Sequence, residues 1–176
     1  QLQTKSLTSE QLMTWVALIT MCLILRRTEQ ALSLFYELEK SVPEELANDP
    51  SLLYLKAYNA FHHNDLQSFA EYCEASAEAF ERLGDFRNSA QPAKDAGYAR
   101  QLIGDFEEAE RILRRTITIA ERLGLHLIAA GTKQKLGMVR SHLGAHEEGR
   151  WIELEAVERY RSYGNPRLAG WSRDYL

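Results

Sequence analysis

Residues 97–109, GYARQLIGDFEEA, decide the fold of this 176-residue chain. The apolar stretch ends at Gly104, and a glycine after the last apolar residue suits the left-handed position that ends a helix. Asp105 is then placed to cap a second helix by accepting a bond from its free amides, and the two glutamates after it favour the helix dipole. The segment therefore predicts two helices, 88–103 and 106–123, joined by a tight turn.

The same features recur at a fixed offset of 40 residues. The tetrapeptide ERLG at 81–84 returns at 121–124, and the glycine pair 97 and 104 returns as 137 and 144. Self-similarity at one offset indicates a repeat protein. Because the turns are short, the helices of each repeat must pack antiparallel. We predict helix pairs at about 10–41, 51–83, 88–123 and 126–163, with a final helix at 166–176.

This pattern predicts an all-α fold. The helix pairs would stack as a right-handed α-solenoid of about four repeats plus a terminal helix, because one pair cannot bury its apolar stripe alone. Residues 1–176 form a single domain by this interpretation, and Pro92 falls in the first turn of its helix, where it does little harm. Since residue 1 is Gln, we expect the chain to be a piece of a larger protein.

Composition argues against several classes of protein. Lys plus Arg is 21 and Asp plus Glu is 25, a net charge of −4, whereas a nucleic-acid-binding domain usually shows a basic excess. The two cysteines, Cys22 and Cys73, cannot build a disulfide framework or a complete zinc site. Free cysteines inside predicted helices favour a reducing, cytoplasmic setting.

An apolar run, MTWVALITMCLIL, occupies residues 13–25. It is shorter than the roughly 20 residues that span a membrane, so no membrane contact is predicted. A helix that is apolar on every side should be covered on every side. We therefore expect a buried first helix. The alternative is a surface that meets a partner or an upstream region.

No residue pattern in the chain points to catalysis, a metal or a cofactor. His142 and His146 have the spacing of a zinc pair on one helix, but Gly144 places them on different helices. His62 and His63 at a helix end are expected to contact its last carbonyls. The arginines of 106–123 alternate with glutamates, which predicts a solvated, salt-bridged face.

The spacing Gly97-x-x-Arg100-x-x-x-Gly104-Asp105-Phe106-x-x-Ala109 resembles the core of the tetratricopeptide repeat (TPR) family. The family has an aromatic residue where this chain has Arg100, and its period is about 34 residues. The longer period is similar to the TPR-like arrays of bacterial regulatory and signalling proteins, including maltose-regulator-type activators. The resemblance implies a scaffold that is not an enzyme and that binds a protein or peptide partner in the bacterial cytoplasm.

The resemblance also implies that the first helix of each pair lines a concave face. The candidate partner-binding residues at these positions are Tyr54, Tyr58, Phe61, Lys94, Tyr98, Gln134 and Met138. The Lys and Asn pair with which some TPR domains hold a C-terminal carboxylate is absent from the matching positions. The alternative for these side chains is packing between repeats.

Two other functions are compatible with the same sequence. The domain could sense a small molecule or peptide and switch an attached effector domain. It could also be an oligomerisation spacer, with the apolar first helix or the unpaired last helix joining copies of the chain, because uncapped ends of a repeat array expose core.

Overall fold

The computed structural model describes residues 7–173, with side chains to residue 170. This range is all-helical and contains no strand. The helices are α1 Ser9–Ile24, α2 Thr28–Glu39, α3 Pro50–His62, α4 Leu66–Arg82, α5 Phe86–Ile103, α6 Phe106–Arg122, α7 His126–His142, α8 His146–Ser162 and α9 Pro166–Arg173, with a 3-10 turn, η1, at Glu44–Leu46. The predicted helix at 166–176 is described as far as Arg173, and its last three residues lie outside the described part.

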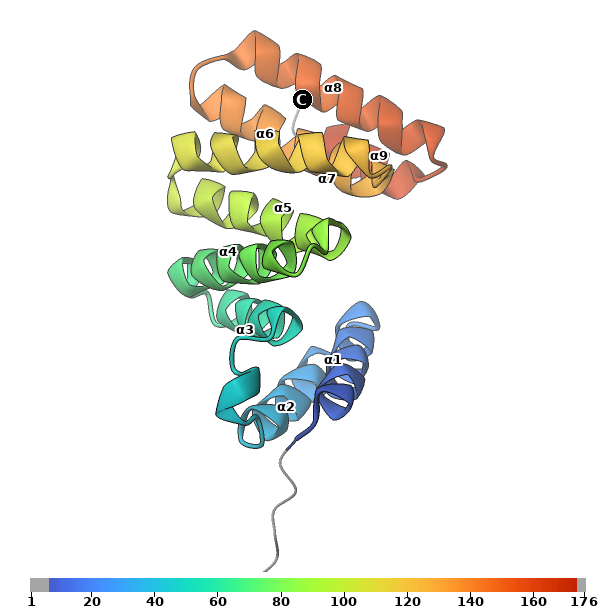
Figure 1. The fold of residues 1–176 in the computed structure, drawn as a ribbon. Coiled ribbons are helices and arrows are strands. Elements are labelled where there is room, and N and C mark those ends of the chain that lie inside the picture. The colour runs from blue at the N-terminus through green and yellow to red at the C-terminus, as the bar shows by residue number, and fades with distance from the viewer. Residues whose placement is uncertain (1–6, 174–176) are drawn as a thin grey trace, which may run out of the picture.

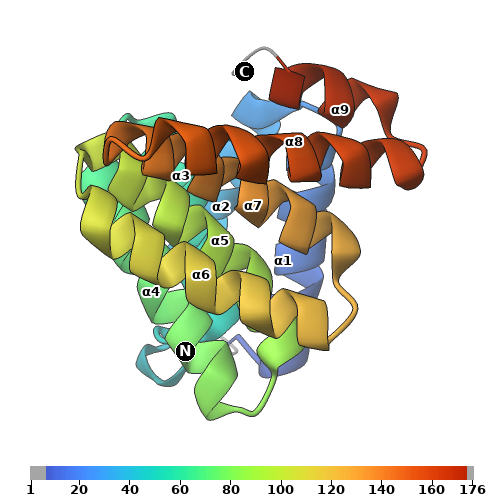
Figure 2. The ribbon, with the colours of Figure 1, turned by 90° about the horizontal axis from the view of Figure 1, so that it is seen from above.

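The helices pack neighbour to neighbour. From α3 to α9 each helix packs against the next one, α1 pairs with α2, and α1 also contacts α3. Figure 1 shows the result as a stack, with α1 and α2 at one end and α8 and α9 at the other. Seen along the stack in Figure 2, the helices cross at an angle, and α8 runs in a different direction from α5 and α6. The expected all-helical fold is confirmed.

The turns from α3 onward close in the same way. The backbone has positive φ at Asn64 and at five glycines, each 20 residues after the previous one, from Gly84 to Gly164. The next residue in every case donates its N–H to the carbonyl five residues earlier, for example Asp105 to Arg100 at 2.9 Å. This is the bond of a Schellman helix end, for which a glycine is the favoured residue. The predicted glycine helix ends are therefore confirmed.

Aspartates begin several of the helices. Asp49, Asp65 and Asp85 each accept a hydrogen bond from a backbone N–H in the first turn that follows. The predicted cap at Asp105 is wrong, because its side chain makes no capping bond. The Asp105 carboxylate instead lies 3.5 Å from the Arg100 guanidinium, a charged partner within reach of the same turn.

The core repeats along the stack at the contact between the two helices of a pair. A Cβ added to Gly97 on α5 would lie 2.6 Å from Cδ2 of Leu113 on α6, and one added to Gly137 on α7 would lie 2.4 Å from Cγ of Glu153 on α8. Only a residue without a Cβ allows this approach. Leu113 is fully buried and Glu153 is 3% exposed. A carboxyl group thus occupies a leucine position in the core.

Pro92 does not lie in a first turn, as the sequence had predicted. Because α5 begins at Phe86, Pro92 is inside the helix, where its side chain is fully buried. Proline has no N–H, so the carbonyl of Asn88 loses its usual partner.

The expectation of a fully buried first helix is also wrong. Leu12, Ile19 and Cys22 of α1 are buried against α2 and α3. The opposite side is exposed and mostly apolar, and it includes Met13, Thr14, Leu18, Met21 and the following Leu25. α1 is covered on one side only, by α2 and α3, because it lies at the end of the stack (Figure 1). Among the described residues, no helix is long and apolar enough to cross a membrane.

Candidate interaction site

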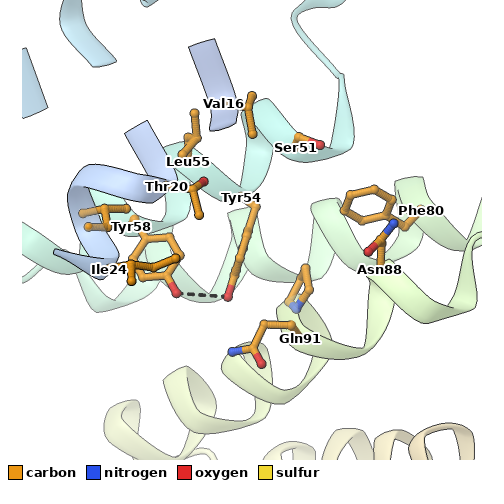
Figure 3. A pocket seen from close by; sticks show the side chains of 12 residues that line it. Val16, Thr20, Ile24, Ser51, Tyr54, Leu55, Tyr58, Phe80, Asn88 and Gln91 are labelled. Atoms are coloured by element: carbon orange, nitrogen blue, oxygen red, sulfur yellow. Dashed lines mark hydrogen bonds between the residues drawn. The ribbon is translucent and has the colours of Figure 1, made fainter. Parts of the chain in front are cut away.

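Two hollows lie along the first helices of successive pairs. The first has a volume of about 500 Å³ and lies between α1, α3 and the start of α5. Figure 3 shows Val16, Thr20 and Ile24 of α1 on one side and Tyr54 and Tyr58 of α3 facing them. Its surface is mostly aliphatic and aromatic, with hydroxyl and amide groups toward α5.

The second hollow has a volume of about 440 Å³ and lies between α5, α7 and the last two helices. Its polar lining consists of Lys94 and Tyr98 of α5, Gln134 and Lys135 of α7, and Tyr160 of α8, and its apolar lining includes Leu127, Ile128 and Leu168. Gln91 of α5 lines both hollows. The two hollows therefore meet at this residue and run in sequence past α1, α3, α5 and α7.

A hydrogen-bonded group separates the two hollows. The Tyr54 hydroxyl donates to Oδ2 of Asp95, and Nε2 of Gln91 donates to the same oxygen at 2.9 Å. Burial, and then the charge of Asp95, raise the pKa of Tyr54 far above its ordinary value. Tyr54 therefore stays a neutral donor, and α3 is tied to α5 at the junction of the hollows.

Tyr58 lies one turn further along α3 and is more accessible. Its hydroxyl oxygen is 3.3 Å from that of Tyr54, and the two rings pack edge to face with centroids 4.9 Å apart (Figure 3). Burial raises the pKa of Tyr58 as well. With 37% of its surface exposed, Tyr58 presents a phenol to the first hollow.

Two lysines line the second hollow. Nζ of Lys94 lies 3.5 Å from Oδ1 of Asp95, and Nζ of Lys135 lies 4.0 Å from the centroid of the Tyr98 ring. Burial, followed by the positive charge of Lys94, lowers the pKa of Lys135. Both effects disfavour the charged form, whereas the ring face of Tyr98 favours it.

The structure places five of the seven predicted site residues around the hollows. Tyr54 and Tyr58 line the first, and Lys94, Tyr98 and Gln134 line the second. The other two residues line neither hollow. Phe61 packs on Phe69 of α4, with ring centroids 4.9 Å apart, and Met138 is half-buried.

Sequence reasoning missed Asp95 and Lys135. A signal for them was present, because residues 94 and 95 correspond to residues 134 and 135 at the offset of 40. Lys135, the position after the predicted Gln134, lines the second hollow, and Asp95, the equivalent position after Lys94, lies beside it. The charges of Asp95 and Lys135 indicate a polar ligand as much as the tyrosines indicate an apolar one.

Ion pairs join successive helix pairs elsewhere on the molecule. Arg100 of α5 donates to both oxygens of Glu74 on α4. Its counterpart at the offset of 40, Arg140, donates to Glu110 on α6 and to Glu148 on α8. An arginine at this repeat position thus joins one helix pair to the preceding pair by a charged contact in both copies.

The other candidate groups have local partners. Nδ1 of His63 lies 2.8 Å from the carbonyl of Asn59, as predicted for a histidine at a helix end. His142 ends α7 and His146 begins α8, which also agrees with the sequence. Cys22 and Cys73 are free and buried, and burial raises the pKa of Cys73. The described residues contain no group of three side chains that could hold a metal ion.

Comparison of the chain with models of known protein families and with curated proteins gave no match.

Proposed function

We propose that this chain is a non-catalytic, TPR-like interaction module of a larger bacterial cytoplasmic regulatory or signalling protein. A protein or peptide partner would lie along the concave side of a right-handed superhelix of about four long repeats. The observation that carries the proposal is the pair of hollows that meet at Gln91. Hollows that follow one another past the first helices of successive pairs are the kind of surface that a stacked repeat protein offers to an extended ligand.

The side chains that line the two hollows support a macromolecular partner. Aromatic residues are enriched at protein interfaces, since a tyrosine offers a large apolar contact and one hydrogen bond. Tyr58 and Tyr98 supply such contacts, one in each hollow. Glutamine side chains, Gln91 and Gln134, add hydrogen-bonding groups between them.

Site-specific photo-crosslinking tests this proposal. A photoreactive phenylalanine analogue would replace Tyr58 in the first hollow or Leu127 in the second, and Trp151 serves as the control because it is 71% exposed on α8 and lines neither hollow. We expect the same partner to be crosslinked from positions 58 and 127 but not from 151. The purified partner should bind the double variant Tyr58→Ala/Tyr98→Ala at least about tenfold more weakly, a loss of about 1.4 kcal/mol. Crosslinks from position 151 alone would overturn the proposal.

A ligand sensor is the second candidate function. A hollow of about 500 Å³ has the size of a small-molecule site. Screening metabolites by thermal shift distinguishes the two functions, because a ligand that binds the folded state raises its melting temperature. A specific shift that Tyr58→Ala abolishes would favour the sensor.

The exposed side of α1 favours a third candidate, an oligomerisation spacer. Monomeric proteins rarely expose a contiguous apolar patch of this kind without a partner. Light scattering over a range of concentrations tests this function, and a strict monomer would exclude it.

A further inference from the structure

The second hollow carries an excess of positive charge in an acidic protein. Two lysines, Lys94 and Lys135, line it, and its lining residues include no carboxylate. The nearest acidic group is Asp95, which already accepts hydrogen bonds from Tyr54 and Gln91. One positive charge therefore remains in the hollow after Asp95 is counted, although the chain as a whole has a net charge of −4.

In the absence of a ligand, the Lys135 ammonium group loses hydration without gaining a full counter-charge. The side chain of Lys135 is half-buried, its ammonium group is held over the Tyr98 ring, and the charge of Lys94 acts against its own while that of Asp95 partly offsets it. A partly buried charge is tolerated when an opposite charge or strong hydrogen bonds compensate for its lost hydration. An anion between Lys94 and Lys135 would supply that compensation.

Charge and donor geometry favour a carboxylate over a phosphate. One uncompensated charge matches a monoanion, whereas a phosphate monoester carries nearly two negative charges at neutral pH. The hollow has no arginine fork, which is the favoured group for bidentate phosphate recognition. The Gln134 amide lines the hollow beside the lysines, and Nε2 of Gln91, which already donates one hydrogen bond to Asp95, has a second N–H.

The surroundings of the lysines are apolar. Leu127, Ile128 and Leu168 form one part of the lining, and the Tyr160 hydroxyl lies close to Gly131, 3.0 Å from where a Cβ there would be. The absence of a side chain at Gly131 leaves room for this hydroxyl and for Cδ of Lys94, so Tyr160 and Lys94 form the wall of the hollow beside α7. The first hollow, which joins at Gln91, continues the apolar surface.

From these observations, and resting on the proposed function, we infer that the second hollow binds a carboxylate carried on an apolar group of the partner. The partner is then a protein segment with an acidic side chain next to apolar residues. Its carboxylate lies between Lys94 and Lys135, and its apolar neighbours extend toward α1 and α3.

Small probes test this inference without the partner. Three compounds with the same ring, 3-phenylpropionate, 3-phenylpropionamide and phenyl phosphate, would be titrated into the ¹⁵N-labelled chain while the amide resonances of Gly131 and Lys135 are followed. Affinities in the millimolar range are expected for ligands of this size, so titration to about 20 mM is sufficient. The variants are Lys135→Gln and, as a matched control with the same change in net charge, Lys56→Gln on α3, which lines neither hollow. Lys94→Gln provides a second test if Lys135→Gln does not fold.

We expect the carboxylate to bind at least about tenfold more tightly than the amide, because a hydrogen bond to a charged group is stronger than one between neutral groups. Lys135→Gln should remove this preference and Lys56→Gln should keep it. Equal binding of carboxylate and amide, tighter binding of phenyl phosphate, an equal loss in both variants, or no shift at all would each overturn the inference. If one of these results is obtained but the crosslinks from positions 58 and 127 still identify one partner, the carboxylate site is excluded and the proposed function is retained.

Discussion

Glu153 is the clearest case in which a single residue departs from the repeat. It takes the place of Leu113 at the offset of 40 and packs over Gly137 as Leu113 packs over Gly97. Burial raises the pKa of Glu153 from 4.5 to about 7. The carboxyl group is therefore protonated in the folded chain over a pH range in which it is ionised in the unfolded chain.

This shift makes a prediction about pH. Since the folded state holds the proton more tightly, the free energy of unfolding falls as the pH rises from about 4.5 to about 7. Glu153→Gln removes the effect, so the variant should be more stable than the wild type at pH 8, by up to about 3 kcal/mol. At pH 4.5 the difference should shrink to within about 0.5 kcal/mol. Urea denaturation at the two pH values measures both quantities.

Glu158→Gln is the matched control, because Glu158 lies on the same helix with its side chain 75% exposed. This variant removes the same charge from the surface of α8, so the gain in stability at pH 8 that is expected for Glu153→Gln should be absent. An equal pH dependence in the two variants would show that Glu153 is hydrated in the folded chain.

The helix pair is the scale at which the glycines matter. Gly97 brings α5 and α6 so close that an added methyl group would meet the Leu113 side chain. In contrast, among the described residues no atom lies within 4 Å of the site of a Cβ on Gly170 in α9. The two positions therefore form a test in which the same substitution has opposite results.

Gly97→Ala should lower the free energy of unfolding by about 1–3 kcal/mol, because overpacking moves a fully buried leucine. Gly170→Ala should leave it unchanged or raise it slightly, since alanine has the higher helix propensity. Thermal or urea denaturation measures both. In the background of Leu113→Ala the cost of Gly97→Ala should decrease, because the clashing group is gone. Additive costs would contradict the contact.

The two sides of α1 also differ at the scale of a helix. Ile19 is 2% exposed, and Met21, two residues later, is 53% exposed. Met21→Lys should change the free energy of unfolding by no more than about 0.5 kcal/mol. Ile19→Lys places a charge in the core between α1, α2 and α3, and should cost more than about 3 kcal/mol. Circular dichroism during urea denaturation distinguishes them, and a large cost for Met21→Lys would show that this side is covered.

The whole molecule is a stack in which each middle helix has neighbours on both sides and each end helix has fewer. Stability in such arrays is a sum of local terms, so the ends open more easily than the middle. We predict that amide hydrogen exchange is slowest in α5, α6 and α7, and faster in α1, α2 and α9. Exchange followed by mass spectrometry measures this gradient. Equal protection of all helices would instead show that the chain unfolds as one unit.

The sequence by itself determined the helices and the turns. Their bounds agree with the predicted ranges within about two residues, because the signals are local. A residue with positive φ ends each helix from α3 to α8, and the residue after it donates its N–H to a carbonyl five positions back. Such a bond depends on neighbours in the chain and not on the rest of the fold. The first residues of α5 were missed, because Asp85 caps that helix three residues before the predicted start and this moves Pro92 into the interior.

The tertiary structure alone decided which groups meet. Nothing local shows that one side of α1 stays uncovered, that the Asp105 carboxylate turns to Arg100 and leaves its capping position, or that Lys135 comes to lie over Tyr98. These outcomes depend on how far apart successive helices lie and at what angle they cross, and that geometry is set by side-chain packing across the stack. The periodicity of the sequence determines on which face of a helix each residue lies, whereas the packing of the helices determines which groups that residue contacts.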